Sequence, residues 1–246
     1  MVDKWGPGFP EKVFLCGDSA GAVFAIGMAL GKDPAFMDEI FRIVAEKSLT
    51  LGHINKASDY CQEAIQAIIG DNPHSHKELT GRCCFGTTTL FSKHRWHISW
   101  SNNEDLLYTA LSSLHIPFLC KANKRIKGQS VLDGAYSFCG RCLPHGDDTL
   151  YVGIDPHAEI TRNFTNTEML FPPTQEAYEK MVETGYDAFM QWDGRLHKKV
   201  GYRQPNYEAL SVLWPMKIIE ILIFRTINFF LKLYEFILRL RSCILC

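Results

Sequence analysis

Ser19 lies between Gly17 and Gly21 in a Gly-x-Ser-x-Gly pattern, and its setting indicates nucleophilic chemistry. An apolar segment, residues 12–16, precedes this pattern, and an alanine-rich apolar segment, residues 22–30, follows it. A serine at a sharp turn from a strand into a helix exposes its hydroxyl, and small neighbours let the two elements pass closely. The Ala20 N–H, at the start of the helix, would then face a developing oxyanion. The alternative is a glycine-rich turn without chemistry, or one that binds phosphate.

A serine nucleophile needs a general base, and one source would be a histidine. In α/β-hydrolases an acid and then a histidine follow the serine along the chain. Three histidines lie late enough for this order, namely His145, His157 and His197. That fold places several strands before the serine, however, and only one short strand fits before Gly17.

The second source of a base is Asp133, which could act on the serine directly. It follows a short apolar step and precedes Gly134 and Ala135, whose small side chains would leave room for the serine to approach. The alternative for this segment is an ordinary Asp-Gly turn.

Strands and helices alternate along the chain, which predicts a layered α/β fold with a largely parallel sheet. Apolar runs and period-two alternation indicate strands over residues 12–16, 82–90, 94–100 and 149–154. Helical periodicity covers residues 22–30 and 34–69. We expect further helices at 103–114, capped by Asn103, and at 174–192, capped by Thr174.

Four stretches together resemble the patatin-like phospholipases, most closely the branch of adiponutrin and adipose triglyceride lipase. Residues 14–22 are similar to the G-x-S-A-G-A elbow of that branch, and residues 133–135 match the D-G-[AG] motif of the family. Residues 105–117 are similar to a helix that runs into an S-x-x-I-P step, and residues 171–187 resemble the segment after the D-G motif. The resemblance covers residues 12–192.

This resemblance implies a three-layer α/β/α fold and a dyad in which Ser19 is the nucleophile and Asp133 the base. It implies hydrolysis of acyl esters of glycerolipids or phospholipids through an acyl-enzyme, with no metal, cofactor or histidine. The family has a first strand and a glycine-rich oxyanion loop before its elbow, and we expect this chain to lack both, which leaves the Ala20 N–H as donor. The alternative is therefore a catalytically impaired protein that binds lipid or a membrane.

The apolar residues are concentrated in the last part of the chain. We expect a patatin-like domain over residues 1–200, a linker over 201–215 and an amphipathic tail over 216–246. Lys217, Glu220 and Arg225 share one side of a helix, and a wide apolar face occupies the other. Five basic and two acidic residues over 216–241 favour binding to an anionic membrane or lipid-droplet surface. The alternatives are docking on the domain's own core and a transmembrane span.

The remaining features set broader limits. The net charge of −1 gives no basic field for nucleic acid. The first residues do not form a signal peptide, so we expect a peripheral protein on the cytoplasmic side of a membrane, such as a lipid droplet or the ER. Cys139 and Cys142, with His145 nearby, form an incomplete zinc pattern and indicate a surface loop instead. Cys243 and Cys246 could accept lipids, although a terminal cysteine is unusual in a prenylation motif.

Overall fold

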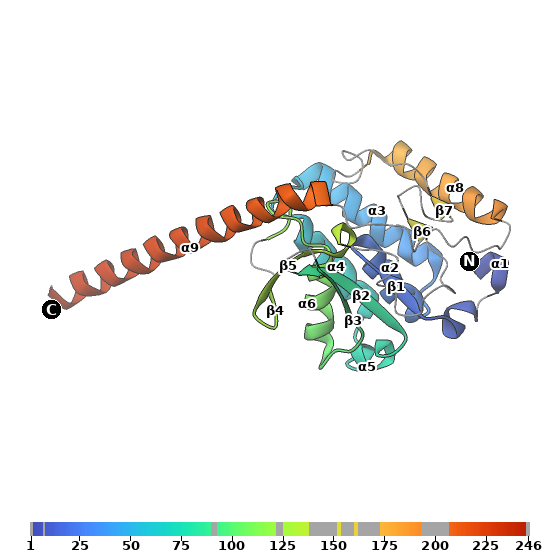
Figure 1. Ribbon diagram of the computed structural model, residues 1–246, viewed down its shortest axis with the longest axis horizontal. Coiled ribbons are helices and arrows are strands. Elements are labelled where there is room, and N and C mark those ends of the chain that lie inside the picture. The colour runs from blue at the N-terminus through green and yellow to red at the C-terminus, as the bar shows by residue number, and fades with distance from the viewer. Residues whose placement is uncertain are drawn as a thin grey trace.

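The fold is a mixed α/β arrangement around a small five-stranded sheet (Figure 1). The computed structural model describes residues 2–6, 8–89, 93–121, 125–137, 152–153, 160–161, 173–192 and 207–244. The sheet order is β1-β2-β5-β4, and β3 also pairs with β2. The strands are β1 (Leu15–Gly17), β2 (Cys83–Thr89), β3 (Lys93–His97), β4 (Arg125–Ile126) and β5 (Gln129–Asp133). A separate parallel pair joins β6 (Val152–Gly153) to β7 (Ile160–Thr161).

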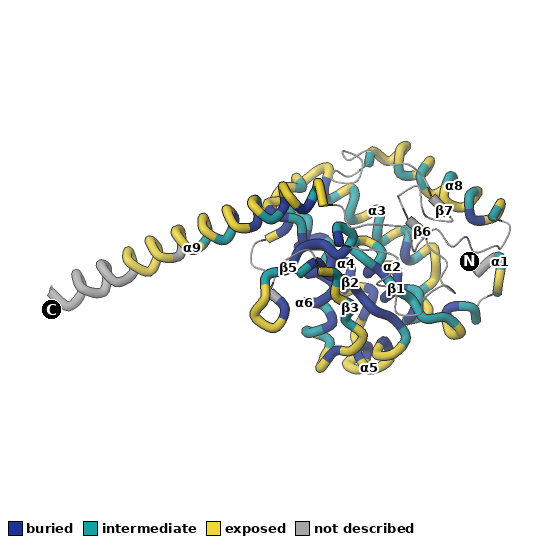
Figure 2. Tube along the Cα trace, in the orientation of Figure 1, coloured by how far each residue is buried: buried dark blue, intermediate teal, exposed yellow. Residues whose placement is uncertain are grey.

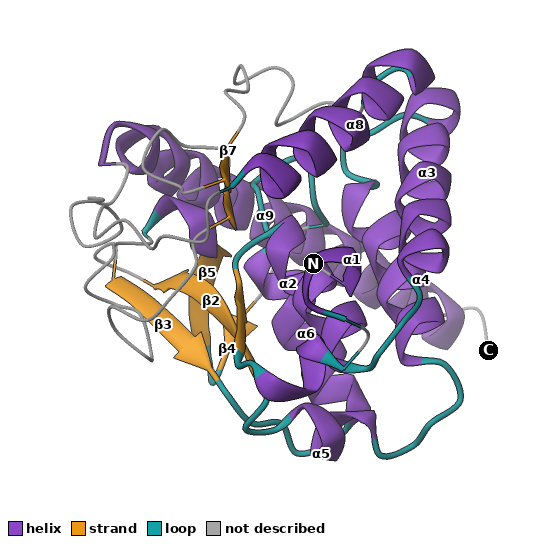
Figure 3. Cartoon of the chain, turned by 90° about the vertical axis from the view of Figure 1, so that its right-hand side faces the viewer, coloured by secondary structure: helices purple, strands orange, loops and turns teal. Residues whose placement is uncertain are grey.

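The helices gather beside this sheet, as Figure 3 shows, and they hold most of the buried apolar core. Ile26 on α2, Ile65 on α4 and Leu106 on α6 are fully buried with Phe85 of β2. Burial of apolar side chains is the main favourable term in such packing. The helical elements are α1 (Val2–Trp5), η1 (Phe9–Lys12), α2 (Ala20–Ala29), α3 (Pro34–Leu51), α4 (Ala57–Ile69), α5 (Ser75–Leu79), α6 (Asn103–Ser113), η3 (Gly134–Tyr136), α8 (Gln175–Gln191) and α9 (Tyr207–Ile244).

The expectation of a largely parallel sheet is wrong for the described strands, because the sheet is mixed. Strand β1 is parallel to β2, but β2 is antiparallel to both β3 and β5, and β4 is antiparallel to β5. Short connections account for two of these pairings, since a parallel pair needs a long crossover. Strands β4 and β5 are joined only by Lys127 and Gly128, both with positive φ.

Two predicted helix starts can be compared with the structure. The Thr174 side chain accepts a hydrogen bond from the Ala177 N–H, so the predicted cap of α8 is confirmed. Helix α6 is capped by Asn102, which accepts from the Asp105 N–H, so the prediction of Asn103 is wrong by one residue. Asn103 instead accepts a hydrogen bond from the His76 N–H at 3.0 Å, and this contact ties α6 to α5.

Helix α9 begins at Tyr207, inside the segment expected to be a linker, and its outer part projects far from the rest of the chain (Figure 1). Leu210 and Leu213 are buried against Leu132 of β5, so the first turns of the helix belong to the domain core. Farther along, exposed residues predominate (Figure 2), with Phe229 and Phe230 each more than 60% exposed. Within the described residues, no helix has the combination of length and apolarity needed to cross a membrane.

Candidate active site

Strand β2 brings the Ser19 turn and Asp133 to the same level of the sheet. Gly17, the last residue of β1, lies opposite Phe85, and Asp133, the last residue of β5, lies opposite Thr87. Because β1 is parallel and β5 antiparallel to β2, the chain leaves the two strands in converging directions. The two predicted catalytic side chains, far apart in sequence, are therefore brought together, and the interaction with Ser19 lowers the pKa of the Asp133 carboxyl.

Ser19 occupies a strained turn between β1 and α2. Its φ of 56° is in the region that non-glycine residues rarely adopt, and such strain costs about 1–3 kcal/mol. A Cβ at Gly17 would lie 2.2 Å from the Gly21 carbonyl oxygen, so the strand and the helix can approach only without a side chain there. A strand, a tight turn and a helix thus surround Ser19 as predicted, although β1 covers Leu15–Gly17 and not residues 12–16, the first of which belongs to η1.

The Ser19 turn is held by a side chain that the sequence did not single out. The Ser19 N–H donates to Ser113 Oγ at 3.0 Å, and Ser113 is fully buried at the end of α6. Ser113 lies inside the segment compared with the S-x-x-I-P step, and that position was the available signal. Ala20, the first residue of α2, is exposed, and among the described residues its N–H has no hydrogen-bond acceptor. That N–H is therefore available to a bound oxyanion.

Asp133 is fixed through both its main chain and its side chain. Its N–H donates to the His115 carbonyl at 2.9 Å, and its own carbonyl accepts from Thr88 Oγ1 at 2.6 Å. Its Oδ1 accepts from the Ala135 N–H at 2.9 Å and so caps the short helix η3. Only 2% of Asp133 is exposed. This is not the setting of an ordinary solvent-facing Asp-Gly turn.

Burial raises the pKa of Asp133 to about 7, although hydrogen bonds from Ser19 and the Ala135 N–H lower it. The carboxyl group of an aspartic acid in water has an ordinary pKa of 3.8, well below this value. At neutral pH Asp133 is therefore close to half protonated, and it can both accept and return a proton. A perturbed carboxyl beside a strained serine is the arrangement expected of a nucleophile and its base.

The small residue after Asp133 is required by neighbours other than Ser19. A Cβ at Gly134 would lie 2.3 Å from the Gly86 carbonyl oxygen and 2.7 Å from Asp18 Oδ1. The space next to Gly134 is thus occupied by Gly86 of β2 and by Asp18, the residue before Ser19. The sequence predicted that Gly134 leaves room for Ser19, whereas the atoms that an added Cβ would meet belong to Gly86 and Asp18.

Asp18 also faces a histidine that the sequence reasoning missed. His94 Nε2 lies 3.7 Å from Asp18 Oδ1, and His94 Nδ1 lies 3.1 Å from Ser137 Oγ. Ser137 Oγ lies 2.7 Å from Thr88 Oγ1, and because the one Thr88 hydroxyl proton goes to the Asp133 carbonyl, Ser137 donates to Thr88. A polar network therefore surrounds the pair of Ser19 and Asp133 on the side of β2 and β3. Nothing in the local sequence pattern marks His94, because only the pairing of β2 with β3 brings it here.

Several other predicted features lie outside the described residues. These are His145, His157 and His197 of the triad hypothesis, Cys139 and Cys142 of the zinc pattern, and Cys246. Cys243 lies in α9, but its side chain is not described. Within the part of the chain that is described, no cluster of three or more His, Cys, Asp or Glu could hold a metal ion.

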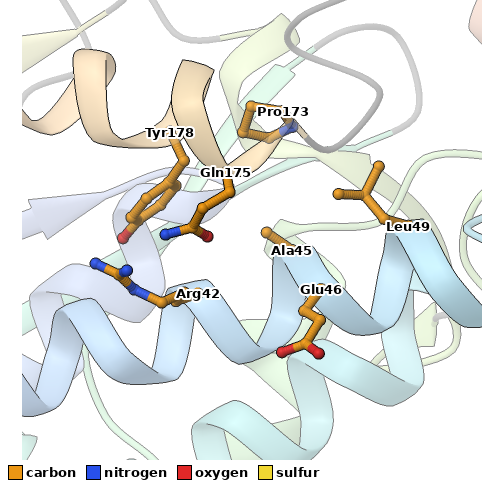
Figure 4. A pocket seen from close by; sticks show the side chains of 7 residues that line it. All are labelled: Arg42, Ala45, Glu46, Leu49, Pro173, Gln175 and Tyr178. Carbon is orange, nitrogen blue, oxygen red and sulfur yellow. The ribbon is translucent and has the colours of Figure 1, made fainter.

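One cavity of about 280 Å³ lies away from this site, between α3 and α8 (Figure 4). Arg42 faces the Tyr178 ring across it, with the guanidinium 5.7 Å from the ring centroid. Arg42 also bonds to Asp38 at 3.0 Å and lies 3.6 Å from Glu179. Arg42 is therefore paired with carboxylates of both helices, and these contacts join α3 to α8.

Comparison with known proteins adds no family assignment. No protein-family model matches the chain, and neither a curated protein nor a solved structure matches it.

Proposed function

We propose that the chain is a serine ester hydrolase that cleaves acyl esters of glycerolipids or phospholipids with Ser19 and Asp133. The observation that carries the proposal is the strained turn at Ser19 beside a buried carboxyl whose pKa is about 7. The resemblance to patatin-like phospholipases, and with it a three-layer α/β/α fold, supports the same reading. The lipid class rests on that resemblance and on the apolar surface of α9.

The chemistry balances with these two side chains and water. Ser19 Oγ bonds to the ester carbonyl carbon while its proton moves to the Asp133 carboxylate, and the carbonyl oxygen becomes an oxyanion near the Ala20 N–H. The carbon–oxygen bond to the alcohol then breaks, and the alcohol takes the proton from Asp133. Water attacks the acyl-Ser19 ester and gives a proton to Asp133. Release of the fatty acid returns that proton to Ser19.

The alternative function, lipid or membrane binding by a catalytically impaired protein, is favoured by a specific surface. The exposed apolar residues of α9 include Ile218 and Leu222 and, farther out, Phe229 and Phe230, each more than half exposed. Such a helix with basic residues suits the interface of an anionic membrane or a droplet. A peripheral location is compatible with both functions, because a lipid hydrolase must also reach its substrate.

A fluorophosphonate probe separates the two functions, because it reacts covalently with an activated serine. The hydrolase proposal expects probe attachment at Ser19 by peptide mass spectrometry, together with turnover of a short-chain p-nitrophenyl ester. Both should be absent from Ser19→Ala and at least a hundredfold slower in Asp133→Asn. A wild-type protein that binds lipid vesicles, but does not react with the probe and does not hydrolyse the ester, would favour the alternative function of lipid or membrane binding. Turnover that survives Ser19→Ala would contradict the dyad.

A further inference from the structure

The first turns of α9 bury two charged side chains of the polar stripe that helical periodicity predicted. Lys217 is 0% exposed and Glu220 is 1% exposed. They form an ion pair with Lys217 Nζ 2.9 Å from Glu220 Oε2. Lys217 Nζ also lies 2.6 Å from Nε2 of His115, whose side chain is fully buried as well. The stripe is thus turned toward the domain, while neighbouring apolar residues of α9 are exposed.

Buried charges persist when each is paired and hydrogen-bonded. Lys217 carries only donors, so a contact with His115 Nε2 requires that nitrogen to accept and places the ring proton on Nδ1. Glu220 is held from a further side, since its Oε1 accepts the Phe118 N–H at 3.0 Å. Burial alone would raise the pKa of Glu220, but the Phe118 N–H and Lys217, both within hydrogen-bond distance of its carboxylate, hold it well below its usual range. Glu220 is therefore ionised at neutral pH.

This cluster touches the residue that holds Asp133. His115, whose ring contacts Lys217, accepts the Asp133 N–H through its carbonyl oxygen at 2.9 Å. On the same side, Leu210 and Leu213 of α9 pack on Leu132, the neighbour of Asp133 in β5. The start of α9 thus supports the end of β5 by two routes, one polar and one apolar.

We propose that Lys217 is a positioning residue for Asp133, acting through its hydrogen bond to the His115 ring. The inference rests on the function proposed above, because it gives Asp133 a geometry that matters for proton transfer. Lys217 fixes the His115 ring, the His115 carbonyl fixes the Asp133 main chain, and the Asp133 carboxyl stays in place beside Ser19. Helix α9 is consequently part of the catalytic apparatus at its start and an exposed apolar surface farther out.

Two variants separate positioning from simple charge compensation. Lys217→Met removes the donor to His115 but leaves the Glu220 carboxylate buried and unpaired, so it should also lower the melting temperature. The double variant Lys217→Met with Glu220→Gln removes that unpaired charge, and the glutamine oxygen can still accept the Phe118 N–H. Lys180→Met, at an exposed lysine of α8, is the control for loss of a helical lysine.

The rate of fluorophosphonate labelling of Ser19, measured on full-length protein against pH, is the first readout. Positioning predicts labelling about tenfold to a hundredfold slower in both Lys217 variants, including the double variant after its stability recovers. The Asp133 pKa should move upward, because its hydrogen bonds from Ser19 and the Ala135 N–H would lengthen. A double variant that labels at the wild-type rate with an unchanged pH midpoint would overturn the proposal.

A second readout does not depend on activity. Carbon-13 NMR of the aspartate carboxyls, assigned with Asp133→Asn, follows the titration of Asp133 in each variant. Tyr136 interacts with the charge of Asp133, and burial raises the pKa of Tyr136 further above its ordinary value, outside the range of this titration. If the wild-type protein does not react with the fluorophosphonate probe, the hydrolase proposal is refuted. A shift of the Asp133 titration in the Lys217→Met variant would still support positioning in that case. An unmoved titration in both Lys217 variants would refute positioning.

Discussion

The Ser19 N–H donates to Ser113 Oγ at 3.0 Å, so a buried serine at the end of α6 holds the turn that presents the nucleophile. This contact restrains a residue with a φ of 56°, which the local chain alone would not favour. The proposed hydrolase therefore depends on α6 as much as on the Gly-x-Ser-x-Gly segment.

Ser113→Ala should slow labelling of Ser19 and lower stability by about 1–3 kcal/mol, because the Ser19 N–H loses its acceptor. Chemical denaturation and fluorophosphonate kinetics measure the two effects. Ser112→Ala is the matched control, since the Ser112 hydroxyl donates to the Tyr108 carbonyl within its own helix. Equal labelling rates in the two variants would show that the contact does not hold the turn.

Asp133→Asn should make the protein more stable at neutral and alkaline pH while it removes activity. The pKa of Asp133 in the folded protein, about 7, lies above its ordinary value of 3.8, so its contribution to stability falls as pH rises between these values. The neutral asparagine avoids this loss, which amounts to about 4 kcal/mol at pH 8.

Denaturation curves at several pH values test this expectation. Asp133→Asn and wild type should have equal stability near pH 3 and diverge above it. The exposed Asp187→Asn, on α8, serves as control and should change stability by less than about 0.5 kcal/mol. A gap between Asp133→Asn and wild type that stays constant with pH would refute the buried, titrating carboxyl.

Gly134→Ala should destabilise the protein by about 3 kcal/mol, because the new methyl group would overlap the Gly86 carbonyl oxygen. Gly185→Ala is the matched control in the exposed part of α8, where nothing lies within 4 Å of an added Cβ. There alanine should stabilise the helix by about 1 kcal/mol. Thermal unfolding of both variants gives the comparison. A Gly134→Ala variant with the stability of the wild type would show that the residues around Gly134 can move to make room for a methyl group.

The outer part of α9 should bind anionic vesicles through its apolar residues. The double variant Phe229→Asp with Phe230→Asp should reduce partitioning at least about tenfold, since two large exposed side chains no longer enter the interface. Co-sedimentation with phosphatidylserine-containing vesicles measures this. Val182→Asp with Tyr186→Asp makes a similar change on exposed residues of α8 and should leave binding unchanged. Equal loss in both would point to general charge repulsion.

The sequence was informative where local pattern decides the structure. The turn at Ser19 and the cap at Thr174 depend on neighbouring residues, and both were predicted. Ser113 and His94 could not be identified in this way, because only the packing of α6 and the pairing of β3 bring them to the site.

The polar stripe of α9 shows a second limit of sequence reasoning. Helical periodicity placed Lys217, Glu220 and Arg225 on one side, but it does not say what that side contacts. His115 contacts Lys217 near the start of α9, where Lys217 and Glu220 are buried, whereas Arg225 is exposed farther along the helix. The mixed sheet was missed for a related reason, since strand direction depends on connections that residue types describe poorly.

The pH dependence of fluorophosphonate labelling at Ser19 tests the central claim most directly. If Asp133 is the base, the labelling rate of wild type should rise with pH to a plateau, with a midpoint near the Asp133 pKa of about 7. Asp133→Asn should label slowly at every pH and without this step. A wild-type rate that shows no step near neutral pH, or an Asp133→Asn protein that labels as fast as wild type, would contradict the account.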